Sequence, residues 1–358
     1  MNLSQARQYQ IALVEWKEGG GGIGEAIRQE LVALEHRPVY FRHDGTLPDH
    51  VDVVFLFGPF GKYLPVLRQL DNVPLEQRPT VVFWNTEGLP DPRIPWPLVS
   101  IIGACRSWIG LFSASDKVWL RSLAGKPPLS LLEARLTRFR YLGDFFYAKK
   151  KGWLDVFADI SAVYADFFNK HGLPAAVAPF GAFSDWYADL DLERDIDVLW
   201  MGKRATKRRS RLLDRLREEL CSHGVKIHMV DNVENPFVFG EERTRLLNRT
   251  KITLNLLRTW YDENSLRICM AAPNRSLVVS EPLLPHVPHY EAGIHYVAAP
   301  SVDKLAETIL YYLEHVDERL RIVEDAYQLL TTTLTMRNSI KIIMEAVDKT
   351  RIPAIKQE

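Results

Sequence analysis

The chain has 358 residues, 47% of them hydrophobic, which suits two globular domains of ordinary size. Its 45 Lys and Arg residues balance its 45 Asp and Glu residues, so the net charge favours neither nucleic acid nor a membrane surface as a partner. The three cysteines are too few and too far apart to indicate a disulfide framework or a zinc site. We find no signal pattern and no apolar run of ~20 residues, so we expect a cytoplasmic protein without integral membrane association.

The first half of the sequence alternates short apolar runs with helical segments. Strands are expected at 11–16, 38–42, 51–57, 80–84, 155–160 and 175–179, and helices at 22–36, 63–70 and 161–171. This alternation is typical of a parallel, doubly wound sheet. Residues 90–151 are rich in Pro, Trp and Arg, and we expect helices and loops there whose positions the pattern does not define.

A second run of alternation follows the acidic and aromatic stretch 181–195, which we interpret as a linker. Strands are expected at 196–201, 225–230, 252–256, 276–279 and 295–298, and helices at 206–223, 241–248, 266–272, 303–330 and 338–349. The sequence therefore predicts an α/β protein with two Rossmann-like domains, 1–182 and 183–358.

The region after the strand 276–279 carries the clearest motif. Ligands of parallel sheets bind beyond the carboxyl ends of the strands, so Ser280, Glu281 and the loop 282–293 with Glu291 are expected at a binding crevice. Residues 265–282, SLRICMAAPNRSLVVSEP, resemble the pattern S-x-R-x-F-E-A-x-A-C-G-A-x-V-V-S-D/E-P of the spore-maturation-type glycosyltransferases, relatives of the group 1 glycosyltransferases.

This resemblance implies a GT-B fold, in which two Rossmann-like domains with parallel sheets face a central cleft. It implies a glycosyltransferase that takes a sugar from a nucleotide-diphosphate sugar bound mainly by the C-terminal domain. The acceptor, an unidentified glycan, protein or small molecule, would bind the N-terminal domain. Relatives also lead us to expect the terminal helix 338–349 to pack back on the first domain.

Two positions depart from the family pattern. Met270 stands where the family has the glutamate expected to hold the donor ribose, and Arg275 stands where it has a glycine. The resemblance assigns Arg267 to the donor diphosphate, and Glu281 or Glu291 is expected to replace the missing ribose contact. The departures also leave open a degenerate transferase that acts as a binding or scaffold module.

The glycine-rich segment 18–24 follows the first expected strand and opens the first expected helix. Gly21, Gly22 and Gly24 resemble the loop that faces the cleft from the N-terminal domain of group 1 transferases. The same segment fits G-x-G-x-x-G, and Asp44 lies where a dinucleotide-binding fold places its ribose-binding acid, which suggests a nicotinamide-dependent oxidoreductase as an alternative. Against it, Lys17 and Glu18 separate the strand from the first glycine, whereas the dinucleotide-binding turn is tight. A flexible turn without a ligand is the third alternative.

A basic cluster follows the strand 196–201. It consists of Lys203, Arg204, Lys207 and Arg208 around Thr206, an expected helix N-cap. Cations at the start of a helix suit a diphosphate, since Arg offers forked donors and Lys a point charge. A solvated basic face is the alternative. Nucleic acid is not expected, because no regularly spaced aromatic residues accompany the cluster.

Glu87 follows the buried strand 80–84 and is our candidate general base for the acceptor hydroxyl, with a purely structural role as the alternative. The histidines show no metal-ligand spacing, and Asp189 and Asp191 lie in the proposed linker. GT-B transferases generally use cations and helix dipoles in place of a metal ion. We therefore expect no metal and no cofactor, only the nucleotide-diphosphate sugar as co-substrate.

Overall fold

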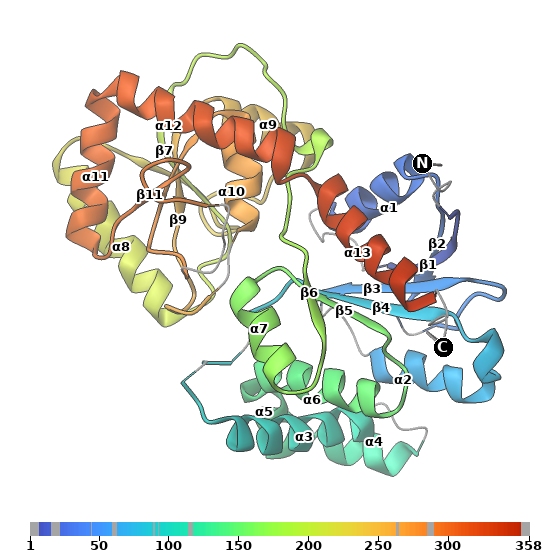
Figure 1. Cartoon of the computed structure of the whole chain (residues 1–358). Coiled ribbons are helices and arrows are strands. Elements are labelled where there is room, and N and C mark those ends of the chain that lie inside the picture. The colour runs from blue at the N-terminus through green and yellow to red at the C-terminus, as the bar shows by residue number, and fades with distance from the viewer. Residues whose placement is uncertain are drawn as a thin grey trace. The chain divides into compact units, whose positions relative to one another are not determined.

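The structure is a computed structural model that describes residues 7–15, 22–43, 45–58, 63–88, 90–91, 93–113, 117–262, 265–284 and 290–351. The chain divides into two compact units. Unit 1 takes the described residues up to Ala178 and those from Ile340 on, and unit 2 runs from Pro179 to Ser339. Both are α/β units with a parallel sheet (Figure 1).

Unit 1 is built on a six-stranded sheet with the order β2-β1-β3-β4-β5-β6, in which every neighbouring pair is parallel. The strands are β1 (Gln10–Glu15), β2 (Arg37–Arg42), β3 (Val53–Gly58), β4 (Thr80–Asn85), β5 (Val156–Asp159) and β6 (Ala175–Val177). All positions of β3 and β4 are buried, because helices cover both faces of the sheet.

Helices lie on both sides of this sheet (Figure 1). They are α1 (Ile23–Ala33), α2 (Tyr63–Leu67), α6 (Thr137–Lys150), α7 (Ala162–Lys170) and α13 (Met336–Arg351), with 3₁₀ turns at Arg68–Asn72 and Leu75–Gln77. Aromatic rings join one face to its helices: Phe83 on β4 lies 4.7 Å from Phe145 on α6, measured between ring centroids. The end of α13 reaches the sheet through Arg351, whose Nε donates to Thr80 Oγ1 at 2.8 Å.

A layer of helices lies outside α6, in a region where the sequence pattern did not define the helix positions. They are α3 (Trp96–Ser113), α4 (Val118–Ala124) and α5 (Leu129–Arg135). α3 packs on α6 at a close crossing of Gly103 and Gly143. A Cβ atom on Gly143 would lie 2.3 Å from both the Gly103 carbonyl oxygen and Ser107 Oγ, so only glycine fits.

Unit 2 holds a five-stranded parallel sheet with the order β11-β10-β9-β7-β8. Its strands are β7 (Ile196–Met201), β8 (Ile227–Val230), β9 (Thr250–Asn255), β10 (Leu277–Ser280) and β11 (Val297–Ala298), and its helices are α8 (Lys207–Ser222), α9 (Gly240–Asn248), α10 (Leu266–Ala271), α11 (Val302–Glu314) and α12 (Val316–Gln328). The core joins buried side chains of the sheet to those of α8, α11 and α12, among them Trp200, Leu216 and Leu305.

Residues 181–195, interpreted from sequence as a linker, lie inside unit 2. They include a 3₁₀ turn, Ser184–Trp186, and the Trp186 ring is buried. The Trp186 carbonyl oxygen accepts from Asn274 Nδ2 at 2.9 Å, and the Ala188 carbonyl oxygen accepts from Asn248 Nδ2 at 3.0 Å. The aromatic residues that interrupt the acidic run therefore pack against unit 2, and the boundary falls before Pro179.

The two sheets share one strand order. Counted along each unit, the first strand lies between the second and the third, so the switch points fall between β1 and β3 and between β7 and β9. Open α/β sheets bind ligands at such a point, beyond the carboxyl ends of the strands. The order differs from the 3-2-1-4-5-6 order of dinucleotide-binding folds and thus disfavours the oxidoreductase alternative. Gly19, Gly21 and Asp44, on which that alternative depends, lie outside the described residues.

The helix crossing at Gly143 yields a first prediction. We expect Gly143→Ala to lower the free energy of unfolding by about 2 kcal/mol, because the added methyl group forces α3 and α6 apart. The control is Ser100→Ala at an exposed position of α3, which should change the free energy of unfolding by less than about 0.5 kcal/mol. Urea unfolding measures both, and equal stability of the two variants would show that the crossing is looser than described.

Candidate functional site

Arg267, in the first turn of α10, bridges the switch point of unit 2. Its Nε donates to the carbonyl oxygen of Met201 at the end of β7, at 2.8 Å. Its Nη1 donates to Asn255 Oδ1 at the end of β9, at 3.2 Å. The guanidinium lies 4.4 Å from the centroid of the Trp200 ring. One side chain therefore joins the two strands between which a ligand of such a sheet binds.

Gly202 leaves the space that this guanidinium occupies. Its φ of 139° is a conformation that residues with a Cβ atom rarely adopt. A Cβ atom there would lie 2.6 Å from Arg267 Nη2. The glycine that follows β7 thus permits both the turn and the close approach of the arginine.

The charge of Arg267 has no carboxylate partner among the described residues. Its hydrogen bonds go to a carbonyl and an amide oxygen, which carry no net charge. Burial, followed by repulsion from Arg209, lowers the pKa of Arg267 to about 9, which still leaves the group cationic at neutral pH. A carboxylate that attracts it, Asp262, is already held by Arg258, so an anion bound beside Arg267 would offset the cost of its partial burial.

Further arginines lie at the same edge of the sheet. Arg258, after β9, forms a two-pronged contact with the buried Asp262 at 2.8 and 2.9 Å. Arg209 Nη1 donates to the Lys203 carbonyl oxygen at 3.1 Å, and burial lowers the pKa of Arg209 to about 10. The sequence analysis did not identify Arg209, Arg258 or Asp262 as site residues, although Arg258 and Asp262 follow the carboxyl end of a predicted strand.

Glu281 holds Arg208 in place. Both of its carboxylate oxygens accept from the Arg208 guanidinium, and one of them also accepts from the Leu257 backbone N–H at 2.8 Å. Arg208 Nη1 in turn donates to the Leu257 carbonyl oxygen at 3.0 Å. The Glu281 residue is 6% exposed, so its carboxylate acts here as an anchor for a cation.

The basic cluster splits into two parts in the structure. Thr206 caps α8, as predicted, by accepting from the Arg209 backbone N–H at 3.2 Å. Lys203 and Lys207 are exposed, and neither ammonium group has an ion-pair partner among the described residues. Arg204 instead pairs with Asp214 on α8 and with Asp231 after β8, the latter at 3.0 Å. Together with Glu234 at 3.8 Å, these carboxylates already offset the charge of Arg204.

The remaining residues predicted in unit 2 differ in their surroundings. Ser280 is buried, and its hydroxyl lies within hydrogen-bond distance of the Asn255 and Glu281 carbonyl oxygens, at 3.1 and 2.6 Å. Glu291 is exposed in a turn, where its backbone N–H donates to His295 Nδ1 at 3.1 Å. Met270 is buried on α10, and its thioether replaces the family's carboxylate without leaving an exposed side chain.

Arg275 does not lie at this edge. It precedes β10, whereas the carboxyl end of β10 is at Ser280, and its guanidinium stacks 4.0 Å from the Tyr327 ring centroid and pairs with Glu324 on α12. The Arg275 backbone is left-handed, with φ 58°. The glycine at this position in the family pattern is therefore explained by a helix C-cap that favours positive φ, and the arginine does not obstruct the crevice.

In unit 1, polar residues gather where β4 and β5 end. Asn85 Nδ2 donates to Asp159 Oδ2 at 2.6 Å and to the Glu87 carbonyl oxygen at 3.2 Å, and both Asn85 and Asp159 are buried. Glu87 is half-buried just beyond them. Asn85 Oδ1 has no hydrogen-bond partner among the described residues. The sequence analysis identified Glu87 but not Asp159, which ends the neighbouring strand.

The predicted glycine loop is described only at its end. Gly22 caps α1 with φ 80°, and a Cβ atom on Gly24 would lie 3.3 Å from Phe57. The backbone conformation at Gly22 and the close packing at Gly24 therefore explain why these two positions are glycines. Gly21 lies outside the described residues.

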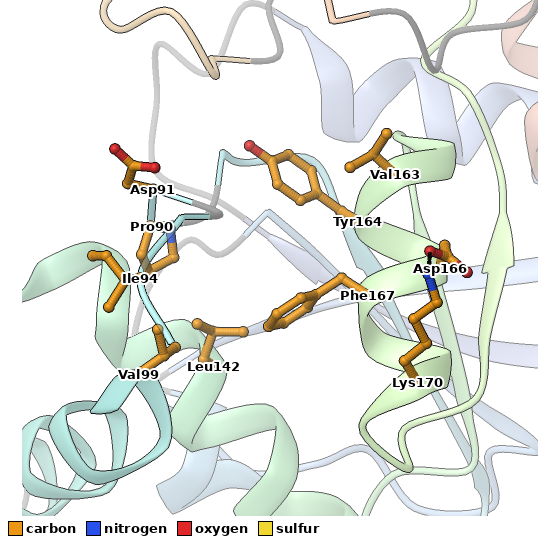
Figure 2. A pocket seen from close by; sticks show the side chains of 10 residues that line it. All are labelled: Pro90, Asp91, Ile94, Val99, Leu142, Val163, Tyr164, Asp166, Phe167 and Lys170. Atoms are coloured by element: carbon orange, nitrogen blue, oxygen red, sulfur yellow. Dashed lines mark hydrogen bonds and ion pairs between the residues drawn. The ribbon is translucent and has the colours of Figure 1, made fainter. Parts of the chain in front are cut away.

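A cavity of about 170 Å³ lies within unit 1, along α7. It is bounded by the segment after β4 and by α3, α6 and α7, through Pro90, Asp91, Ile94, Val99, Leu142, Val163, Tyr164, Asp166, Phe167 and Lys170. Figure 2 shows Phe167 and Leu142 pointing toward each other across it, with the Asp166–Lys170 ion pair at one side. The walls are mainly apolar, and a few polar groups are available to orient a ligand.

Glu281 gives a second prediction. Glu281→Gln should lower the free energy of unfolding by about 1.5–3 kcal/mol, because it removes the charge that holds Arg208. The control is Asp303→Asn, whose carboxylate is exposed and lies 3.7 Å from Arg215, and we expect a change below about 0.5 kcal/mol. Chemical denaturation of both variants would refute the anchoring role if Glu281→Gln were as stable as the control.

Comparison with known proteins bears on this arrangement. Residues 207–345, less than half of the chain, match the family described as "Glycosyl transferase-like". No curated protein sequence matches the chain. Among solved structures the chain is similar to TarM, with a TM-score of 0.55 at 9% identity; the match covers 84% of this chain but only 54% of TarM.

Two similar structures are matched over nearly their whole length. HepE from Anabaena, in complex with UDP and glucose, has a TM-score of 0.56 at 11% identity, with 96% of this chain and 99% of that chain covered. Sucrose-phosphate synthase from Thermosynechococcus elongatus has a TM-score of 0.54 at 10% identity, with the same coverage. The predicted resemblance is thus confirmed: the chain has the GT-B fold, and residues 207–345 match a family described as "Glycosyl transferase-like".

Proposed function

We propose that the protein is a glycosyltransferase that moves a sugar from a nucleotide-diphosphate sugar to an acceptor hydroxyl without a metal ion. The observation that carries the proposal is the unpaired cation of Arg267 at the switch point of unit 2. The match of residues 207–345 to a glycosyltransferase family supports it. So do similar structures that were solved with UDP and a sugar.

In this proposal the donor diphosphate lies against Arg267. Lys203 and Lys207 supply mobile point charges near the start of α8, where free backbone N–H groups also favour an anion. Arg208, oriented by Glu281, completes the positive edge. We therefore assign Glu281 a positioning role toward Arg208, with Ser280 supporting the strand end. Arg204 contributes less than the sequence suggested, because Asp214 and Asp231 hold it.

The chemistry follows from these charges. The bond between the anomeric carbon and the diphosphate oxygen breaks, the diphosphate keeps the electron pair, and the acceptor oxygen bonds to the anomeric carbon. Cations placed around the departing diphosphate stabilise the charge that develops on it. Glu87 accepts the proton of the acceptor hydroxyl. In this scheme cations take the role that a metal ion plays in other transferases.

The acceptor is proposed to bind unit 1, where the segment that follows Glu87 supplies Pro90 and Asp91 to the wall of the cavity. Its mainly apolar walls suit an acceptor with an apolar portion next to the reacting hydroxyl. Asp159 and Asn85 would orient that hydroxyl through the polar groups at the strand ends. We place the reaction in the cytoplasm, with a glycan, a protein or a small molecule as the acceptor and no nucleic acid.

A second candidate function is suggested by Met270. Because a thioether cannot accept hydrogen bonds from a ribose as a carboxylate does, a nucleotide-binding module that has lost turnover would show the same substitution. Incubating the protein with a panel of nucleotide sugars and measuring release of nucleoside diphosphate decides between the two. Release above the background, including slow hydrolysis, supports the transferase, whereas binding without any release supports the module.

Arg267 provides a third prediction. Arg267→Gln should weaken binding of UDP by about 1.5–3 kcal/mol, since it removes a charge-assisted contact to the diphosphate. Arg215→Gln is the control, because Arg215 is exposed on α8 and pairs only weakly with Asp303, and its affinity should equal that of the wild type. Isothermal titration calorimetry measures the UDP affinity of both folded variants. An unchanged affinity in Arg267→Gln would show that Arg267 does not contact the diphosphate.

Glu87 provides a fourth prediction. Glu87→Gln should lower the rate of sugar transfer by about 10²–10⁴-fold and leave the UDP affinity unchanged, because a general base acts on the acceptor and not on the donor. Glu76→Gln, at an exposed 3₁₀ turn of the same unit, is the control. A Glu87 variant with the wild-type rate would assign the residue a structural role.

A further inference from the structure

The outer face of α3 is apolar although solvent reaches it. Leu98, Ile101, Cys105 and Trp108 recur every three or four residues and therefore share one side of the helix, and all are exposed. Ile101 and Trp108 keep 62% and 64% of their surface in contact with solvent. The opposite side, with Val99 and Gly103, is buried and packs on α6. A helix that covers a core normally carries polar residues on its outer side.

The next two helices, α4 and α5, also expose large apolar side chains to solvent. We define the α3–α5 surface by its large exposed apolar residues, which are Leu98, Ile101, Trp108, Val118, Trp119, Leu123, Leu131 and Leu132. α3, α4 and α5 contact one another and form the outermost layer of unit 1 (Figure 1). A group of this size, with two exposed tryptophans, is unusual on a protein that works alone in water.

The charge of this region differs from that of the whole chain. Residues 96–135, which carry this surface, contain five Lys and Arg residues, of which Arg106 is buried, and two Asp and Glu residues, whereas the chain as a whole is neutral. Lys117 and Lys126 stand directly before and shortly after α4, and both are exposed. The apolar surface is thus flanked by positive charge.

We propose that the α3–α5 surface docks the protein on a phospholipid bilayer that carries anionic headgroups. Tryptophan favours the boundary between headgroups and acyl chains, and the leucine and isoleucine side chains reach into the apolar layer. The lysines extend to the anionic headgroups, each with a favourable contribution. Because the other side of α3 is fixed on α6, the helices lie along the membrane surface. A second copy of the chain is a poorer occupant, because symmetric pairing would bring the same cations together.

Vesicle sedimentation with the full chain tests this proposal without reference to activity. The protein should sediment with vesicles of phosphatidylcholine and phosphatidylglycerol, and the bound fraction should fall at high salt and on pure phosphatidylcholine. Trp108→Ser with Trp119→Ser should lower the partition coefficient by about tenfold or more, because less apolar area is buried. The matched control is Leu75→Ser with Leu320→Ser, two exposed apolar residues outside the surface, and should bind like the wild type.

A second variant tests the charge separately. Lys117→Glu with Lys126→Glu should weaken binding to anionic vesicles while the apolar residues stay in place. Circular dichroism confirms that each variant is folded. Absence of vesicle binding by the wild type, or equal binding by the tryptophan variant and its control, overturns the proposal. A wild-type dimer in analytical ultracentrifugation that the tryptophan variant abolishes, without vesicle binding, would identify the surface as a contact between copies.

Discussion

The candidate donor site depends on one arginine that ties two strand ends together. Arg267 binds the last residue of β7 through a carbonyl oxygen and the last residue of β9 through an amide side chain. The Trp200 ring lies against its guanidinium, and Gly202 leaves the space beside it. This arrangement keeps a cation at the switch point of the sheet without neutralising it. A protein gains little stability from such a group, and we therefore propose that Arg267 serves as an anion site.

The other charges of unit 2 are organised around this constraint. Asp262 and Glu281 hold Arg258 and Arg208, and acids after β8 and on α8 hold Arg204. Arg267 differs from these because its contacts are with neutral groups. The distinction matters for function, since a paired arginine must lose a partner to bind phosphate, whereas Arg267 does not.

Much of the fold could be predicted from the sequence, because buried strands in a parallel sheet appear as short apolar runs. The strand Ile196–Met201 and the cap at Thr206 match the prediction at the level of single residues. The helices of residues 96–135 could not be placed, because the outer face of α3 is as apolar as its inner face and hides the helical period. Arg204 meets Asp231 only because the fold brings the end of β8 beside it, and no local sequence pattern shows this contact. The left-handed backbone at Arg275 is likewise set by the end of a helix and not by a local pattern.

A crystal structure of the protein with UDP tests the central claim most directly. The account predicts that the diphosphate lies at the carboxyl ends of β7 and β9, within hydrogen-bonding distance of the Arg267 guanidinium and near the N-terminus of α8. A diphosphate bound away from Arg267, with that guanidinium still held only by the Met201 carbonyl and Asn255, would contradict it.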